Sequence, residues 1–239
     1  MPPRSHGRPP ARVRPADDAL LGVSRAGRRL RLARARRRRT LAVCGRFFAA
    51  IDILVRTLEA RDAYTCGHSL RVRRYCLLLA EARALGPRER WQIGLAAKLH
   101  DIGKVGIPES VLNKPGPLTD EERRLVQRHP VLGEQILAPM VRSRAVLAAV
   151  RGHHERLDGG GYPDGLAGAS ISRAARVLAI GDCFDALTSA RAYRAALPPS
   201  QALDVLRAGA GSQFDPGLVE TFAQVVCRLP APRPVRVTA

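Results

Sequence analysis

The sequence has 239 residues, 46% of them hydrophobic, so it is long enough to bury the core of one ordinary domain. Its formal net charge is +19, but about +12 of this lies in residues 1–46, where 14 arginines stand against two acidic residues. The uneven distribution argues against a polyanion-binding surface that covers the whole protein, and no specific nucleic-acid partner is expected.

Cysteine usage and hydropathy exclude two further classes. The five cysteines are scattered and never spaced as C-x-x-C, which argues against a disulfide framework and a zinc ribbon and fits a reducing compartment. No uncharged apolar run approaches the roughly 18 residues that cross a bilayer, and the arginine-rich start lacks the apolar centre of a secretory signal. We therefore expect a cytoplasmic protein without a membrane span.

Residues 1–40 are rich in proline, glycine and arginine and end in four consecutive arginines. Such a composition predicts a mostly disordered segment, because it offers few apolar side chains to pack. A tether to nucleic acid or acidic lipid is one interpretation, and a solvated extension without a role is the simpler one. Residues 230–239 are expected to form a flexible tail.

From Leu41 onward, apolar residues recur at helical spacing, beginning with Phe48, Ile51, Val55 and Leu58 on one face. The same period continues through residues 70–85, 91–102, 121–137, 144–154, 174–188, 200–206 and 218–227. Glycine and proline signals separate these stretches, and Thr119 with Glu122 forms a capping box. The pattern predicts one all-α domain over residues 41–229.

Histidines beside carboxylates carry the chemical signal. Five of the six histidines lie in the predicted domain: His68, His100, His129, His153 and His154. His100 directly precedes Asp101 near a predicted helix end, and Asp182 supplies a late carboxylate. Each alone would be ordinary, but nitrogen and oxygen donors without cysteine indicate Mn, Fe, Co, Ni or Zn rather than a thiolate or Ca/Mg site. More than four candidate ligands indicate more than one ion.

A series of short motifs follows in order along the chain. They are YTCGHS at 64–69, LHDIGKVGIP at 99–108, KPG at 114–116, HHE at 153–155, DGGGYP at 158–163, DALTS at 185–189, YR at 193–194 and FDP at 214–216. In this order the sequence resembles the HD-GYP subgroup of the HD phosphohydrolases over about residues 50–226. The resemblance implies an all-α HD-domain helical bundle with an additional C-terminal GYP helical region. It also implies hydrolysis of cyclic di-GMP to linear pGpG, with GMP as a further product.

The resemblance implies a binuclear centre in which Asp101 bridges two divalent transition metal ions, Fe or Mn first, with Co, Ni or Zn as alternatives. His100 and Asp182 would serve one ion, and His68 would complete the ligand set. His129, His153 and His154 would serve the other ion. Two such cations lower the pKa of a bridging water and stabilise charge on the attacking and leaving oxygens. Asp101 and Lys104 are thus the expected catalytic residues.

The expected substrate contacts are Asp62, Lys104, Tyr162, Arg191 and Arg194. Lys104 lies three residues beyond Asp101, so its ammonium can reach a phosphate at the metals. The two arginines could hold a second phosphate with forked hydrogen bonds. Asp62 could equally cap a helix end, and Tyr162 could equally belong to a tight glycine-rich turn.

Tyr64 stands where some relatives place a glutamate that helps to hold a third metal. A tyrosine phenol stays protonated at neutral pH and is a poor replacement, so two ions and accumulation of pGpG are expected.

Two other functions compete with the enzyme. A catalytically silent HD-GYP module would bind cyclic di-GMP or a diguanylate cyclase (GGDEF) partner, but every ligand for two metals is retained. A nucleic-acid-binding protein would use the basic N-terminal segment, which lacks interleaved aromatic residues. A homodimer is compatible with the sequence.

Overall fold

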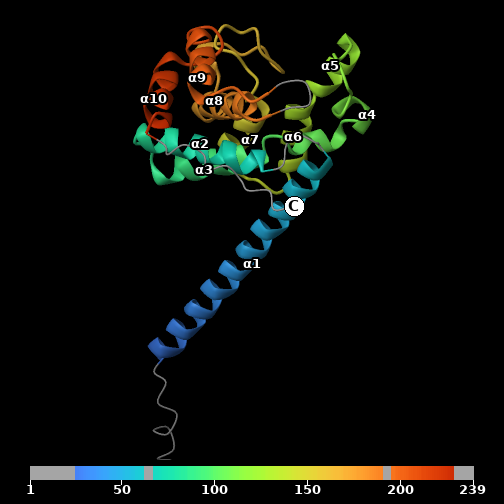
Figure 1. The fold of residues 1–239 in the computed structure, drawn as a ribbon. Coiled ribbons are helices and arrows are strands. Elements are labelled where there is room, and N and C mark those ends of the chain that lie inside the picture. Colours follow the sequence, from blue (N-terminus) through green and yellow to red (C-terminus); the bar gives the residue numbers. More distant parts are fainter. Residues whose placement is uncertain (1–24, 62–66, 191–194, 229–239) are drawn as a thin grey trace, which may run out of the picture. The chain divides into compact units, whose positions relative to one another are not determined.

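The computed structural model describes residues 25–61, 67–190 and 195–228, and over these residues the chain is helical without a strand (Figure 1). The α-helices are α1 Arg25–Arg61, α2 His68–Ala82, α3 Pro87–Leu99, α4 Glu109–Leu112, α5 Asp120–Val126, α6 His129–Leu137, α7 Arg144–Arg151, α8 Arg173–Thr188, α9 Pro199–Ala208 and α10 Pro216–Val226. Two short 3-10 helices, η1 Ile102–Gly106 and η2 Gly168–Ser170, lie between them. The prediction of an all-α fold is confirmed.

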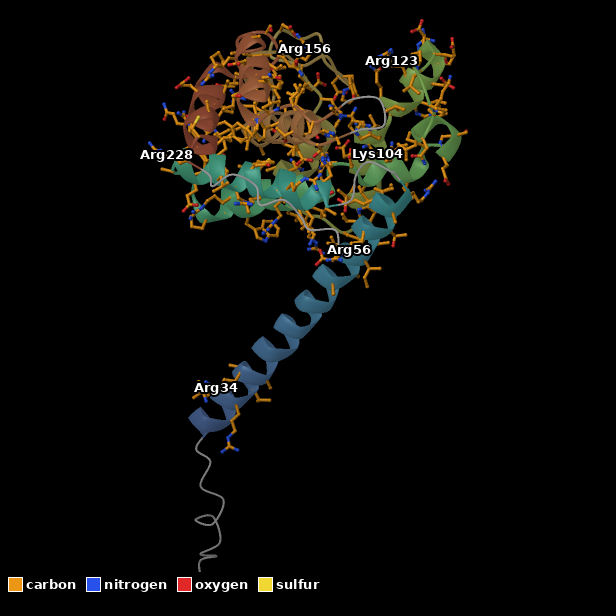
Figure 2. All side chains as sticks on the ribbon, viewed as in Figure 1. Arg34, Arg56, Lys104, Arg123, Arg156 and Arg228 are labelled. Carbon is orange, nitrogen blue, oxygen red and sulfur yellow. The ribbon has the colours of Figure 1, made fainter. Side chains whose placement is uncertain are left out.

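The chain divides into two units, Met1–Ala50 and Ile51–Ala239. In the first unit, helix α1 begins at Arg25, and side chains such as Arg34 project from it into solvent (Figure 2). The structure thus has residues 25–40 in a helix, whereas their composition predicted a mostly disordered segment. Arginine, leucine and alanine are good helix formers, and no proline interrupts the chain between Pro15 and Pro87, so helix propensity prevails over the lack of packing.

The core of the second unit forms where α2 packs against α3 and α8, and where α7 packs against α3, α6 and α8. Helices α9 and α10 add a C-terminal region against α8. Tyr75, Phe184 and Phe222 meet edge to face, with ring centroids 5.0 to 6.1 Å apart, and join α2, α8 and α10. None of the described helices combines the length and apolar character needed to cross a membrane.

Helix ends differ from the sequence prediction at three places that matter for the site. The stretch predicted as one helix over residues 121–137 is two helices, α5 and α6, because Pro130 has no amide hydrogen to donate to the carbonyl of Val126 four residues earlier. Helix α3 ends at Leu99 and α7 at Arg151, earlier than predicted. As a result, His100 and His153 lie just beyond the last residues of α3 and α7, and His129 is the first residue of α6.

Candidate metal centre

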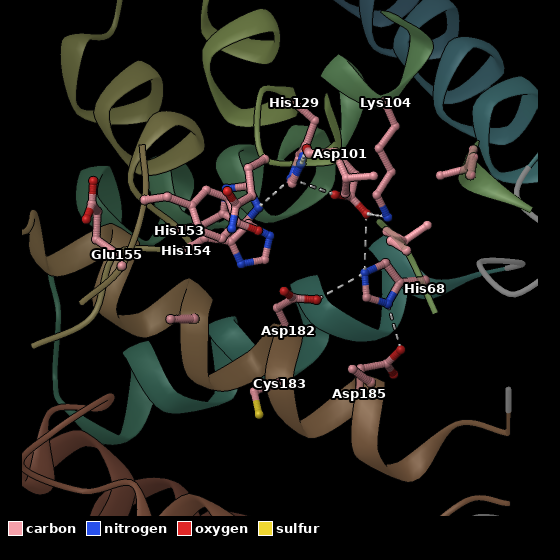
Figure 3. A pocket seen from close by; sticks show the side chains of 18 of the residues that line it. His68, Asp101, Lys104, His129, His153, His154, Glu155, Asp182, Cys183 and Asp185 are labelled. Atoms are coloured by element: carbon pink, nitrogen blue, oxygen red, sulfur yellow. Dashed lines mark hydrogen bonds and ion pairs between the residues drawn. The ribbon is translucent and has the colours of Figure 1, made fainter. Parts of the chain in front are cut away.

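A cavity of about 710 Å³ opens between α2, η1, α6, α8 and the loop after α7. Its walls include six of the seven predicted metal ligands: His68, Asp101, His129, His153, His154 and Asp182 (Figure 3). The seventh, His100, is buried directly behind His68, with 3.3 Å between the two Nε2 atoms. The structure thus brings all seven residues together from five regions of the chain.

Helix ends orient three of the histidine rings. The Nδ1 atoms of His100, His129 and His153 lie 2.7 to 2.9 Å from the carbonyl oxygen three residues earlier. A carbonyl can only accept, so each Nδ1 donates this hydrogen bond, and in the neutral ring Nε2 is left with a lone pair for a metal. This is the arrangement in which a protein offers histidine to a metal.

The exposed lone pairs face one another. His129 Nε2 lies 3.2 Å from His153 Nε2, and burial holds the pKa of both rings below the ordinary value, so both are neutral. Burial likewise lowers the pKa of His154 to about 4. Two neutral acceptors at this distance repel each other, whereas a cation between them would be attracted to both.

Asp101 spans the cluster with its two carboxylate oxygens. Its Oδ1 lies 3.4 Å from His129 Nε2, and its Oδ2 lies 3.5 Å from His100 Nε2 and 3.8 Å from His68 Nε2. Although burial opposes ionisation, the neighbouring His100 and Lys104 side chains hold the pKa of Asp101 well below its usual range. One ionised carboxylate therefore faces both halves of the site.

His68 is held differently, by side chains. Its Nδ1 donates to Asp185 Oδ2 at 2.8 Å, and its Nε2 lies 3.3 Å from Asp182 Oδ1. Burial lowers the pKa of His68, but the bonds to Asp182 and Asp185 outweigh it and raise the pKa to about 10. Arg71 in turn holds Asp185, with Nε 2.7 Å from Oδ1 and Nη2 3.0 Å from Oδ2.

Three groups of these residues could each hold an ion, because their ligand atoms lie within 4.8 Å of one another. The groups are His129, His153 and His154; His68, His100 and Asp101; and His100, His153 and Asp182. The donors are imidazole nitrogens and carboxylate oxygens without sulfur, a set that suits divalent transition metals. The site therefore fits a divalent metal centre.

Lys104 reaches the same site from η1. The tight 3-10 turn places residues 101 and 104 on one side, and Lys104 Nζ lies 2.7 Å from Asp101 Oδ2. The ammonium stands at the cavity wall beside the carboxylate, as expected from the spacing.

Tyr162 enters the cavity from the loop after α7. Its ring stacks on His154, with centroids 4.8 Å apart, and its amide donates to the His154 carbonyl at 3.2 Å. The loop is anchored by buried Glu155, which accepts from the amides of Asp164 at 2.7 Å and Leu166 at 3.0 Å. At Gly161 a Cβ would lie 2.4 Å from the Arg156 nitrogen, so only glycine allows this close turn.

Three predicted substrate contacts, Asp62, Arg191 and Arg194, lie outside the described residues, and so does Tyr64. Sequence reasoning assigned no role to Asp185, Arg71 or Glu155. Asp185 stands in the DALTS motif and Glu155 directly follows the histidine pair, so both positions carried a signal. For Arg71 the only signal in the sequence was its position three residues after His68, which puts both side chains on one face of a helix.

Residues 50–218 match the family described as HD domain. This is more than half of the chain, so the chain belongs to the HD domain family, whose phosphohydrolases use divalent metals. The resemblance to the HD-GYP subgroup is confirmed, because the chain is similar to proteins named as cyclic di-GMP phosphodiesterases and to an HDG"Y"P protein of known structure.

One relative is the cyclic di-GMP phosphodiesterase response regulator RpfG of Xanthomonas campestris, 44% identical over 173 residues, which are 71% of this chain and 45% of RpfG. Another is the 3'3'-cGAMP-specific phosphodiesterase 3 of Vibrio cholerae, 39% identical over 72% of this chain and 38% of the relative. The chain therefore spans less than half the length of these two proteins.

Solved structures show the same fold. The HDG"Y"P protein Bd1817 from Bdellovibrio bacteriovorus aligns with a TM-score of 0.57 and 21% identity over 67% of this chain and 51% of that one. The cyclic GMP-AMP phosphodiesterase V-cGAP3 of V. cholerae aligns with the same TM-score and 20% identity over 74% of this chain and 49% of that one. At such identities the likeness supports the fold alone.

Proposed function

We propose that the chain is a metal-dependent phosphodiesterase that hydrolyses cyclic di-GMP to linear pGpG, with GMP as a slower product. The observation that carries the proposal is the position of Asp101, whose two oxygens face two separate groups of histidines. Relatives named as cyclic di-GMP phosphodiesterases support the substrate, and none of this depends on Asp62 or the arginines at 191 and 194.

The proposed metal centre contains two divalent ions, Fe or Mn. His129, His153 and His154 would hold one ion, His68, His100 and Asp182 would hold the other, and Asp101 would contact both. When bound, the ions would supply Lewis acidity toward phosphoryl oxygens and make water more acidic at neutral pH. The partly buried, ionised carboxylates of Asp101 and Asp182 would balance their charge.

The other residues of the cavity bind and orient the substrate. Lys104 would stabilise the negative charge that develops on the phosphate next to Asp101. Tyr162, fixed against His154, would stack on or border a base at the open side of the centre. The cavity volume of about 710 Å³ lies within the range of pockets that enclose a small ligand.

The deciding experiment is product analysis by chromatography after incubation of the purified, Mn- or Fe-loaded protein with cyclic di-GMP. 3'3'-cGAMP serves as the competing substrate, because relatives are named for each. Appearance of pGpG, and its loss in Asp101→Asn, is the expected result. Metal binding without any product would instead favour the silent module that binds cyclic di-GMP. A diguanylate cyclase partner and a homodimer remain predictions of the resemblance.

A further inference from the structure

We propose that Glu59, near the end of helix α1, is a positioning residue for the metal centre, because its carboxylate holds the backbone on both sides of His68. The inference rests on the proposed function to the extent that it takes His68 as a metal ligand. It concerns residues 51–61 of α1, which belong to the same unit as the site.

Glu59 binds two backbone amides with its two carboxylate oxygens. Oε2 accepts from the Gly67 amide at 3.0 Å, and Oε1 accepts from the Ser69 amide at 2.9 Å. His68 lies between these two residues, and both His68 and Ser69 are buried. A single side chain from another helix therefore fixes the peptide segment that carries a proposed ligand.

The start of helix α2 needs such a partner. The first amides of any helix lack an intrahelical acceptor and are normally satisfied by the side chain of the capping residue. Here the capping residue is Gly67, which has no side chain, and the first turn of α2 contains no acidic residue. The Glu59 carboxylate takes over the capping role and also interacts favourably with the positive end of the helix dipole.

This support is specific to His68. The rings of His100, His129 and His153 are instead oriented by backbone carbonyl oxygens three residues earlier in their own segments. The His68 ring depends on Asp185 at Nδ1 and on the backbone that Glu59 holds. Loss of Glu59 should therefore disturb the half of the site to which His68 contributes.

The segment that carries Glu59 is firmly docked. Ile51, Val55 and Leu58 are buried, and Asp52 forms an ion pair with Lys98. The α1 segment is thus a rigid element from which a carboxylate can position α2.

The end of α1 also contacts the residue that follows helix α4. The Arg61 carbonyl accepts from Asn113 Nδ2 at 2.8 Å. Asn113 directly follows α4, whose Val111 and Leu112 line the cavity. Helix α1 therefore contacts both the start of α2, which carries His68, and the end of α4, which lines the cavity.

The test compares Glu59→Ala, Glu59→Gln and the control Asp52→Asn, which removes another polar contact of the same helix. Mn²⁺ affinity is measured by chelator competition, hydrogen exchange of the peptide starting at residue 67 by mass spectrometry, and kcat and KM with cyclic di-GMP. For Glu59→Ala we expect about 10-fold weaker binding of one ion, faster exchange at the start of α2, and a fall in kcat with little change in KM. Glu59→Gln should show effects between those of Glu59→Ala and the wild type, because its side-chain amide keeps one acceptor oxygen. Asp52→Asn should bind Mn²⁺ with wild-type affinity.

Wild-type metal affinity and wild-type exchange in Glu59→Ala would overturn the inference, as would an equal loss of affinity in Asp52→Asn. If Glu59→Ala does not fold, the Glu59→Gln variant decides by the same measurements. A wild-type protein that neither binds Mn²⁺ nor hydrolyses cyclic di-GMP would refute the proposed function, whereas the exchange data would still test the cap.

Discussion

Substitution of Gly103 by alanine should move Asp101 away from His129 in the proposed metal centre. A Cβ at this position would lie 1.9 Å from the His129 carbonyl oxygen and 2.5 Å from the Gly133 nitrogen, and both neighbours are backbone atoms. Ordinary contact begins near 3.4 Å, so η1 and α6 would have to part by about 1.5 Å. Asp101 lies on one side of this contact and His129 on the other.

The expected effect follows from that displacement. Metal–ligand bonds of about 2.0 to 2.2 Å tolerate errors of roughly 0.2 Å, so Asp101 could no longer share an ion with His129. A misplacement of about 1 Å costs on the order of 100-fold in rate, and overpacking of this kind costs about 1 to 3 kcal/mol of stability.

Elemental analysis, denaturant unfolding and a cyclic di-GMP turnover assay would measure these effects. Gly86→Ala is the matched control, since nothing lies within 4 Å of a Cβ there and its φ of −65° suits alanine. The control should lose less than about 1 kcal/mol. Wild-type metal content and turnover in Gly103→Ala would refute the close packing of η1 on α6.

Three further predictions concern the site and the N-terminal segment. Asp101→Ala should abolish hydrolysis and lower metal content, because it removes the carboxylate that faces both groups of ligands; unchanged turnover with unchanged metal would contradict the site assignment. Lys104→Ala should lower kcat by about 10- to 100-fold while metal content stays near that of the wild type, and a parallel fall of both would make Lys104 a support of the centre instead. Deletion of residues 1–45 should leave the cooperative thermal transition and the hydrolysis rate within about two-fold of the full chain, and loss of the transition would show that the segment is structural.

The sequence predicted which histidines and aspartates gather at the cavity because their types and order are a local property that can be read along the chain. It did not predict Asp185 as the partner of His68, since 117 residues separate them and only the packing of α2 on α8 brings them together. The same holds for Glu59, whose capping role depends on where α1 docks.

Helix boundaries were the less predictable part of the fold. Apolar periodicity ran through residues 121–137 without a gap, and the break before His129 is explained by Pro130, which has no amide hydrogen to continue the helix. Over residues 25–40, composition suggested disorder, whereas the structure has a helix that agrees with the high helix propensity of arginine, leucine and alanine.

The two ways of orienting histidines give the two halves of the centre unequal tolerance to mutation. A peptide carbonyl is present whatever residue carries it, so no single side-chain replacement at residues 97, 126 or 150 deletes the acceptor that orients His100, His129 or His153. The acceptor of His68 is the Asp185 carboxylate, which one nucleotide change can remove. Natural variation that tunes metal affinity without destroying the centre should therefore accumulate around His68 rather than around the other three rings.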